Sequence, residues 1–265
     1  MPTVTTQDIS VDTAEGRLFA RRWTPDTLDT RQAPMVLFHD SLGCVELWRD
    51  FPRQLAAATG RAVIAYDRLG FGRSDPYPGE LQAGFIEQEA RQGFRRVHAA
   101  LGLDQFVALG HSVGGGMALV CAVVHEASCR ALITESAQMY TEEFTLQGIR
   151  QAREAFAQPG QLDRLKKYHG DKAAWVLSAW IDTWLSPRFA DWHLDDYLRA
   201  VRCPVLSLHG GEDEYGSLEH PRRLATLAGA RSVIFEACGH VPHREQPERV
   251  IAEITQWLRQ PASAT

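Results

Sequence analysis

The sequence predicts an α/β fold, with a mostly parallel eight-stranded sheet, helices on both faces and an inserted helical cap. Short runs of apolar and β-branched residues alternate with longer stretches of helical periodicity, which is the pattern of repeated strand–helix crossovers. Residues from about 138 to 198 interrupt this alternation, because they show helical patterns and no strand-like run. We therefore expect a core formed by residues 1–137 and 199–265, with residues 138–198 inserted as the cap.

The expected strands are short runs rich in apolar residues. Two candidates open the chain, four central runs follow, and the last two come after the inserted segment. In chain order they are residues 8–11, 18–23, 35–38, 62–66, 106–109, 131–134, 205–208 and 233–235. The four central runs are almost entirely apolar, which is typical of strands buried on both faces.

Two helices outside the inserted segment follow from their apolar spacing. Apolar residues at positions 47, 51, 55 and 58 predict one helix, which Gly60 ends. Those at positions 250, 251, 254, 257 and 258 predict a closing amphipathic helix. We expect Trp257 in this last helix to pack on the core rather than to bind a ligand.

The composition is that of an ordinary globular protein. The chain has 265 residues, 45% of them hydrophobic, so it can bury a sizeable core. Its net charge of −5 gives no general attraction to nucleic acid or to anionic membranes, and we expect neither as a partner. The start of the chain lacks the features of a signal peptide, and no apolar run reaches the length of a membrane span. We therefore expect a cytoplasmic protein with reduced cysteines, and the sequence leaves its oligomeric state open.

Residues 110–114 read Gly-His-Ser-Val-Gly and lie between an expected strand and an expected helix. A serine at such a turn presents its hydroxyl above the edge of the sheet, and the helix N-terminus attracts a developing anion. Gly110 and Gly114 let the turn close without a clash of Cβ atoms. Ser112 is therefore the candidate nucleophile rather than a simple helix cap, and the neighbouring His111 should point away from it.

A serine nucleophile needs a base, and the base needs a carboxylate that fixes its tautomer. His240 follows the last expected strand, in a loop that can place its imidazole over Ser112. It is therefore the candidate base. His243 is the weaker alternative, and we expect it to brace the loop or to start the next helix.

Asp213 follows the strand expected at residues 205–208 and is the candidate acid. Glu212 and Glu214 flank it, and spacing alone does not choose among the three, although we expect both glutamates to be solvated. The chain order serine, aspartate, histidine matches one serine hydrolase fold and differs from the orders of the others. His39, His209 and His240 lie on separate loops without ligand spacing, so we expect no metal and no other cofactor.

Four motifs resemble those of the α/β-hydrolase superfamily, and within it the cap-bearing branch of small esterases, cofactor-free haloperoxidases and carbon–carbon bond hydrolases. In order they are residues 39–43, residues 67–74, the turn at Ser112, and the loops that carry Asp213 and His240. The resemblance covers nearly the whole chain and is weakest in the cap. It implies the α/β-hydrolase fold and, because a serine rather than an aspartate stands at the turn, acyl transfer.

The resemblance also implies an oxyanion hole made of two backbone N–H groups. These map to Val113 and Ser41, with Leu42 as the nearest rival of Ser41. Where the family usually has His-Gly, this chain has His39 and Asp40. A carboxylate here would oppose the oxyanion or contact the substrate, but we expect Asp40 to close an Asx turn on its own loop.

Besides Asp40 and Leu42, four residues are candidates for contact with the substrate. Glu135 follows the strand at residues 131–134, so it could face the substrate, replace the triad acid or form an ion pair at the strand end. Trp175, Trp180 and Trp184 recur at spacings compatible with one broad helical face. They could wall an apolar pocket over the nucleophile or only dock the cap on the core.

The sequence thus predicts a serine hydrolase that acts on a small molecule, namely a small apolar or aromatic carboxylic ester, through an acyl-enzyme on Ser112. Hydrolysis of a carbon–carbon bond in a β-diketone-like ring-fission product is the first alternative, and perhydrolysis is another. A ligand receptor that keeps the fold without catalysis is the remote one.

Overall fold

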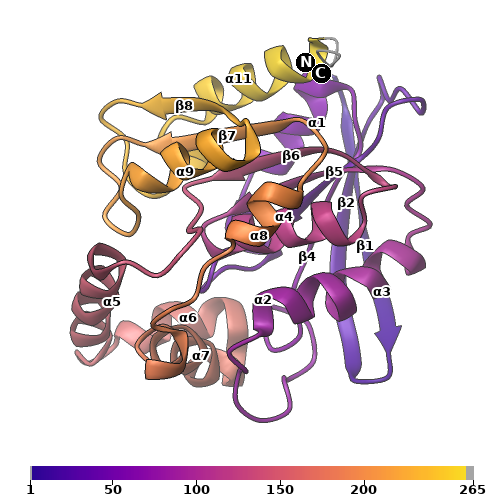
Figure 1. Ribbon diagram of the computed structural model, residues 1–265. Coiled ribbons are helices and arrows are strands. Elements are labelled where there is room, and N and C mark those ends of the chain that lie inside the picture. Colours follow the sequence, from indigo (N-terminus) through magenta and orange to yellow (C-terminus); the bar gives the residue numbers. More distant parts are fainter. Residues whose placement is uncertain (1, 261–265) are drawn as a thin grey trace.

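The predicted strands form one eight-stranded sheet in the order β1-β2-β4-β3-β5-β6-β7-β8 (Figure 1). The structure is a computed structural model that describes residues 2–260. Neighbouring strands from β4 to β8 are parallel, whereas β2 is antiparallel to both β1 and β4. The predicted, mostly parallel sheet is confirmed. Its strands are β1 (Val4–Thr13), β2 (Gly16–Pro25), β3 (Met35–Phe38), β4 (Val63–Tyr66), β5 (Phe106–His111), β6 (Cys129–Glu135), β7 (Val205–Gly210) and β8 (Arg231–Phe235).

The first two strands are longer than the sequence predicted. β1 and β2 each span ten residues and pair along their whole length, from Val4 opposite Pro25 to Thr13 opposite Gly16. Most side chains of β1 are exposed, because this strand forms the edge of the sheet. An apolar run marks only the part of such a strand that faces the core, so it underestimates the strand's length.

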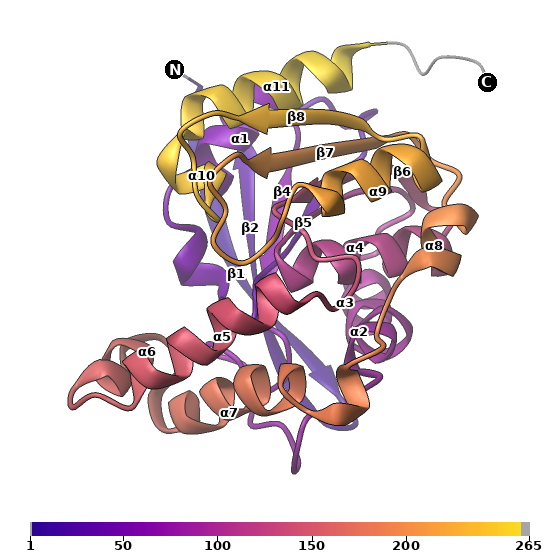
Figure 2. The same ribbon diagram turned by 60° about the vertical axis from the view of Figure 1, so that its left-hand side comes forward.

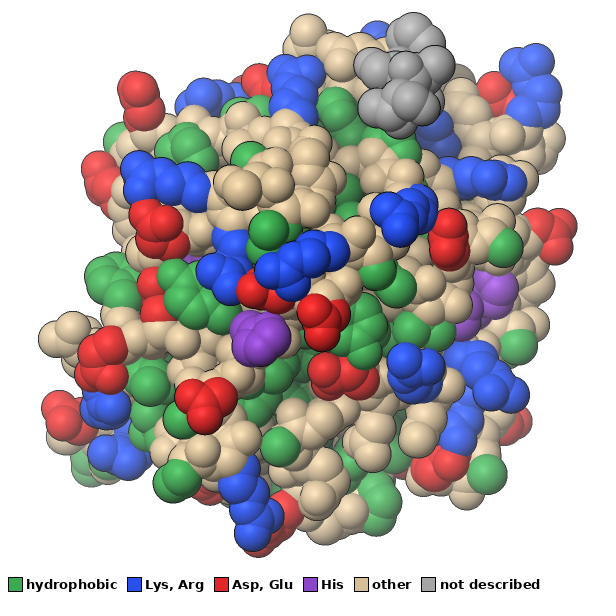
Figure 3. Space-filling view, viewed as in Figure 1, with side chains coloured by type: hydrophobic (Ala, Val, Ile, Leu, Met, Phe, Trp, Pro, Cys, Tyr) green, Lys and Arg blue, Asp and Glu red, His purple; other side chains and the backbone are tan. Residues whose placement is uncertain are grey.

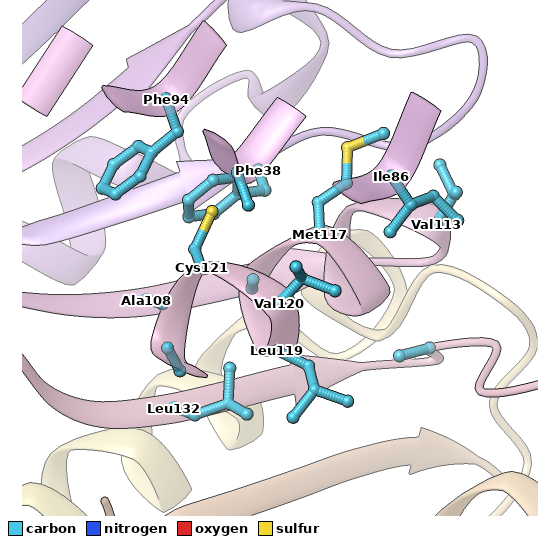
Figure 4. Packing of buried hydrophobic residues seen from close by; sticks show 14 of the residues in the cluster. Phe38, Ile86, Phe94, Ala108, Val113, Met117, Leu119, Val120, Cys121 and Leu132 are labelled. Atoms are coloured by element: carbon cyan, nitrogen blue, oxygen red, sulfur yellow. The ribbon is translucent and has the colours of Figure 1, made fainter. Parts of the chain in front are cut away.

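Alternate residues of the central strands enter two apolar layers, one on each face of the sheet. On β3, Met35 and Leu37 pack with α1 and α11, whereas Val36 and Phe38 pack with α2, α3 and α4. Figure 4 shows this second layer, where Phe38 lies among side chains of α4 and near Phe94. Helices on both faces explain why the central strands are apolar throughout.

Both helices predicted outside the insertion are present, and α1 and α11 cover the same face of the sheet. Gly60 ends α1 in a left-handed conformation, as expected. The helical elements of the core are η1 (Val45–Trp48), α1 (Phe51–Thr59), α2 (Phe85–Gln88), η2 (Glu89–Gly93), α3 (Phe94–Ala100), α4 (Val113–Val124), α9 (Glu219–Ala228), α10 (Pro242–Glu245) and α11 (Pro247–Arg259).

Between β6 and β7 the chain forms a group of helices beside the sheet (Figure 2). Helices α5, α6 and α7 pack on one another, whereas α8 packs on α4 and α9 of the core. The boundary expected at residue 198 falls within α8. The elements of this segment are α5 (Glu143–Phe156), α6 (Gln161–His169), η3 (Gly170–Lys172), α7 (Ala173–Trp184), η4 (Pro187–Phe189) and α8 (Asp195–Ala200).

The surface mixes charges of both signs. On the face shown in Figure 3, acidic and basic side chains are interspersed, and neither sign forms a continuous field. This distribution fits the modest net charge of −5. Within residues 2–260, no helix has both the length and the apolar character needed to cross a membrane.

Candidate active site

Ser112 lies between the end of β5 and the start of α4, with φ of 55° and ψ of −129°. A positive φ is strained for a residue with a side chain, so the surrounding structure must hold it. A Cβ atom at Gly110 would lie 2.0 Å from the carbonyl oxygen of Gly114, and one at Gly114 would lie 2.2 Å from that of Phe38. Both glycines are therefore required, as the sequence predicted.

His240 lies in the loop after β8, and its Nδ1 atom is 2.8 Å from Oδ1 of Asp213. The same carboxylate oxygen accepts hydrogen bonds from the backbone N–H groups of Tyr215 and Gly216. Burial acts to raise the pKa of Asp213, but the His240 ring and these hydrogen bonds outweigh it, so the pKa is lowered. Asp213 therefore stays ionised and holds the Nδ1 proton of His240, which leaves Nε2 available as a base.

Burial distinguishes Asp213 from its acidic neighbours. The side chain of Asp213 is 1% exposed, whereas Glu212 and Glu214 are exposed, as expected for solvated residues. Glu214 also contributes to the site, because its Oε2 atom accepts a hydrogen bond of 3.1 Å from the backbone N–H of His240. One carboxylate thus holds the ring of His240, and a second holds its backbone.

The hydroxyl of Ser112 donates a hydrogen bond to Oε1 of Gln138, 3.1 Å away. Within the described part of the chain no hydrogen bond joins Ser112 to His240, although both line the same cavity. Catalytic hydrogen bonds often form only in the substrate complex, and the Ser112 hydroxyl must leave Gln138 before it can donate to His240. Sequence reasoning missed Gln138, because no local pattern marks it as a partner of Ser112.

A cavity of about 150 Å³ lies over Ser112, where the loops that follow β3, β5, β6, β7 and β8 meet the inserted helices. Apolar side chains form much of its wall, and within the described residues Asp40 is its only carboxylate. It is lined by Asp40, Ser41, Leu42, His111, Ser112, Gln138, Thr145, Ile149, Trp180, Trp184, Tyr215, His240 and Val241. The cavity is therefore suited to a small and largely apolar group.

Two of the three tryptophans proposed to line the pocket reach it. Trp180 and Trp184 lie on the cavity wall, but Trp175 stacks on Tyr77 and donates a hydrogen bond from its indole nitrogen to the carbonyl oxygen of Gly79. Trp175 therefore does not line the pocket, and of the two alternatives it follows the second, in which the tryptophan docks the inserted helix on the core. Helical geometry explains the difference. Trp180 and Trp184 are four residues apart and so lie about 40° apart around the helix axis, whereas Trp175 and Trp180 are five residues apart and lie about 140° apart.

Asp40 closes the expected Asx turn, since its Oδ1 atom accepts a hydrogen bond of 2.8 Å from the N–H of Leu42. This bond occupies the Leu42 N–H, which removes Leu42 as the rival oxyanion donor. The N–H groups of Ser41 and Val113 make no hydrogen bond to any part of the chain that the structure describes. Both remain available to an incoming oxyanion.

Glu135 lies outside the cavity and is 1% exposed at the end of β6. Its carboxylate accepts hydrogen bonds from the backbone N–H and from Nδ1 of His243. The idea that Glu135 contacts the substrate or replaces the triad acid is therefore wrong, because both its oxygens serve this strand-end pair. His243 braces the loop that carries His240, as expected.

His111 takes part in the site through contacts that the sequence did not predict. It lines the cavity, and its Nε2 atom lies 2.8 Å from the backbone carbonyl oxygen of His240. Its Nδ1 atom lies 3.3 Å from Oδ2 of Asp40. These contacts could not be predicted because they depend on which loops the tertiary structure places beside His111.

The described residues, 2–260, hold no group of three or more His, Cys, Asp or Glu side chains arranged to bind a metal ion. The buried histidines serve hydrogen bonds within the protein instead. His39 accepts a hydrogen bond from the backbone N–H of Arg68, and the ring of His209 donates one to the carbonyl oxygen of Gly216.

Comparison with known proteins agrees with this geometry. A family model described as alpha/beta hydrolase family matches residues 35–253. The proline iminopeptidase of Lactobacillus delbrueckii subsp. bulgaricus is 24% identical over 268 residues, covering 86% of this chain and 90% of that protein. The solved proline iminopeptidase of Mycobacterium smegmatis has a TM-score of 0.74 at 22% identity, covering 96% of this chain and 98% of the other. A thermophilic esterase from Thermogutta terrifontis has a TM-score of 0.72 at 22% identity, with coverage of 96% and 98%. Because the family model spans most of the sequence, the chain belongs to the alpha/beta hydrolase family.

Proposed function

We propose that this protein is a serine hydrolase that cleaves small apolar or aromatic carboxylic esters through an acyl-enzyme on Ser112. The observation that carries the proposal is the shared cavity, in which the strained Ser112 turn meets the His240 ring that Asp213 orients. These three side chains have the chemical types that acyl transfer requires. The apolar wall above them favours a substrate without charge.

The proposed reaction proceeds in two halves. Ser112 Oγ attacks the ester carbonyl carbon while its proton passes to Nε2 of His240, and the N–H groups of Ser41 and Val113 hold the oxyanion. The C–O bond then breaks, and the departing alcohol takes the proton from His240. A water molecule next attacks the acyl-enzyme, gives a proton to His240, and releases the acid as Ser112 regains its proton.

The shape of the cavity supports a small acyl group. Ile149 of α5 and Trp180 and Trp184 of α7 face Ser112 from the inserted helices. A volume of about 150 Å³ is below the range of pockets that hold drug-sized ligands. The size limit therefore comes from helices that are not part of the sheet, and the bound group should meet mainly aromatic and aliphatic surface.

An aminopeptidase activity like that of the named relatives has less support. A substrate with a free terminal amine carries a positive charge, which a buried site must pair with a carboxylate. Asp40 is the only carboxylate on the described cavity wall, and its two oxygens already face the Leu42 N–H and the His111 ring. The same contacts, with the pairing of Glu135 to His243, occupy the two carboxylates that would favour carbon–carbon bond hydrolysis.

The test is reaction of the purified protein with a fluorophosphonate and with p-nitrophenyl acetate and butyrate. We expect the phosphonate to modify Ser112, and Ser112→Ala to lose both reactions. Asp213→Asn should lower kcat about 10³- to 10⁴-fold because it disturbs the His240 tautomer, whereas Glu212→Gln should leave kcat nearly unchanged. Turnover of proline p-nitroanilide without turnover of either ester would replace this proposal with the aminopeptidase.

A further inference from the structure

His111 is held between two hydrogen-bond acceptors. Its Nε2 atom lies 2.8 Å from the carbonyl oxygen of His240, and a carbonyl can only accept. Its Nδ1 atom lies 3.3 Å from the Asp40 carboxylate. A neutral imidazole has one N–H and therefore satisfies only one of these contacts, whereas an imidazolium satisfies both. The geometry thus requires a second proton on the pair formed by Asp40 and His111.

The other contacts of Asp40 place that proton on His111. Oδ1 of Asp40 accepts the Leu42 N–H, and this bond favours the ionised carboxylate. Arg68 and His39, which lie beside it, both contact the backbone carbonyl oxygen of Asp40, and their charges and dipoles also favour an anion. The pair is therefore a carboxylate and an imidazolium.

We propose that Asp40 and His111 form a partly buried ion pair that joins the oxyanion loop, residues 39–43, to the backbone of His240, and that loss of its proton at alkaline pH slows reaction at Ser112. This inference rests on the proposed function, because it assigns positioning residues to that reaction. It also explains how a carboxylate can lie beside an oxyanion hole. While His111 is protonated, the pair has no net charge to oppose the oxyanion.

The groups around His111 determine how it titrates. Asp40 faces it from the loop after β3, Glu135 lies on neighbouring β6, and the rings of His240 and His243 lie 5.0 Å and 5.1 Å from its ring. Burial acts to lower the pKa of His111, but Asp40 and then Glu135 outweigh it, so the pKa is raised. Burial lowers the pKa of His243, and the nearby Glu135 carboxylate opposes this effect only in part. His243 therefore stays neutral and adds no competing cation.

Deprotonation of His111 has a predictable effect. As pH rises through its raised pKa, Nδ1 loses its proton and faces Asp40 as a lone pair. The carboxylate then carries an uncompensated negative charge near the N–H groups of Ser41 and Val113. That charge disfavours a second negative charge on the tetrahedral oxyanion, so the rate of attack by Ser112 should fall.

Asp40→Asn separates this charge effect from packing. The amide oxygen can keep the hydrogen bond from the Leu42 N–H, and the amide NH2 can donate to Nδ1 of a neutral His111. Both loop contacts survive while the charges disappear. Asp196→Asn is the matched control, because Asp196 has a side chain that is 93% exposed and lies on α8, outside the cavity.

The experiment measures the rate of Ser112 phosphonylation against pH together with long-range ¹H–¹⁵N NMR of the histidine rings. We expect the wild type and Asp196→Asn to lose rate at alkaline pH and Asp40→Asn to keep it. We also expect both His111 ring nitrogens to be protonated at neutral pH in the wild type and only one in Asp40→Asn. A neutral His111 ring in the wild type would overturn the proposal, as would an alkaline loss of rate that persists in Asp40→Asn.

The NMR result separates the two proposals. If the phosphonate leaves Ser112 unmodified in the wild type, the proposed hydrolase function fails, while the protonation state of His111 still decides whether the ion pair exists. The wild-type spectrum also decides this point if Asp40→Asn does not fold.

Discussion

The ring of His169, at the end of α6, donates a hydrogen bond from Nε2 to the backbone carbonyl oxygen of Leu42, 3.0 Å away. Its Nδ1 atom accepts a hydrogen bond of 2.9 Å from the N–H of Gly72, which fixes this neutral tautomer. An inserted helix therefore holds the loop that carries Ser41 against a second loop of the core. Burial lowers the pKa of His169, in keeping with its neutral state.

Replacing His169 should damage both stability and catalysis. His169→Phe keeps an aromatic ring but leaves the Gly72 N–H and the Leu42 carbonyl without their partner, which should lower the free energy of unfolding by about 2 kcal/mol. Phosphonylation of Ser112 should slow about tenfold, because the Ser41 N–H is less well positioned. Urea denaturation measures the stability, and the rate of reaction with the fluorophosphonate measures the positioning of Ser41. His193→Ala, at an exposed position, is the control. Unchanged kinetics in a destabilised His169→Phe would contradict the positioning role.

Gln138 should restrain the nucleophile. Gln138→Leu has nearly the same volume and removes the acceptor of the Ser112 hydroxyl, so the hydroxyl becomes free to donate to His240. Since a hydrogen bond of this kind contributes about 1 kcal/mol, phosphonylation should accelerate about fivefold. Gln147→Leu, at an exposed position of α5, is the control. A slower reaction in Gln138→Leu would mean that the amide assists the transition state.

The two partly buried tryptophans of α7 provide a matched pair for the size of the cavity. Trp180→Ala enlarges the space over Ser112, so kcat/KM for p-nitrophenyl hexanoate relative to the acetate should rise about tenfold. Trp175→Ala removes contacts with Tyr77 outside the cavity and should leave this ratio unchanged. Steady-state kinetics with the ester series measures both. Equal changes in the two variants would argue against the cavity as the acyl site.

The pairing of Glu135 with His243 should stabilise the fold in a pH-dependent way. Burial opposes ionisation of Glu135, but the His243 contacts and the nearby His111 lower its pKa below the ordinary value of 4.5. Its contribution is therefore complete above pH 4.5 and is lost as the pH falls through the lowered pKa. Glu135→Leu leaves two buried donors unpaired and should cost about 3 kcal/mol at neutral pH.

Urea denaturation of the wild type and Glu135→Leu at neutral and at acidic pH tests this sign. The difference between the two proteins should shrink on acidification. A difference that is constant with pH would assign the loss to packing alone. Glu135→Gln, which can accept the His243 N–H and donate to the ring, is the control and should lose less than Glu135→Leu.

The fold and part of the site could be predicted from the sequence because the patterns that indicate them are local. Buried strands are continuous apolar runs, and Gly110 and Gly114 mark the turn around Ser112 in the sequence itself. The choice of Asp213 over Glu212 and Glu214 depended on burial, which spacing does not encode. The contacts of Gln138 and His111 depend on loops that are 26 to 129 residues away along the chain, so no local pattern predicts them.

The packing of α5 against the loop after β7 limits how the specificity of this protein can be altered. Thr145 donates a hydrogen bond of 2.7 Å to the carbonyl oxygen of Tyr215, and a Cβ atom at Gly148 would lie 2.8 Å from that of Glu214. The inserted helices thus support the segment that presents Asp213 as well as enclosing the cavity. They are not an exchangeable module. Grafting the corresponding helices of another hydrolase to obtain a new specificity would have to rebuild these supports before any altered selectivity could be observed.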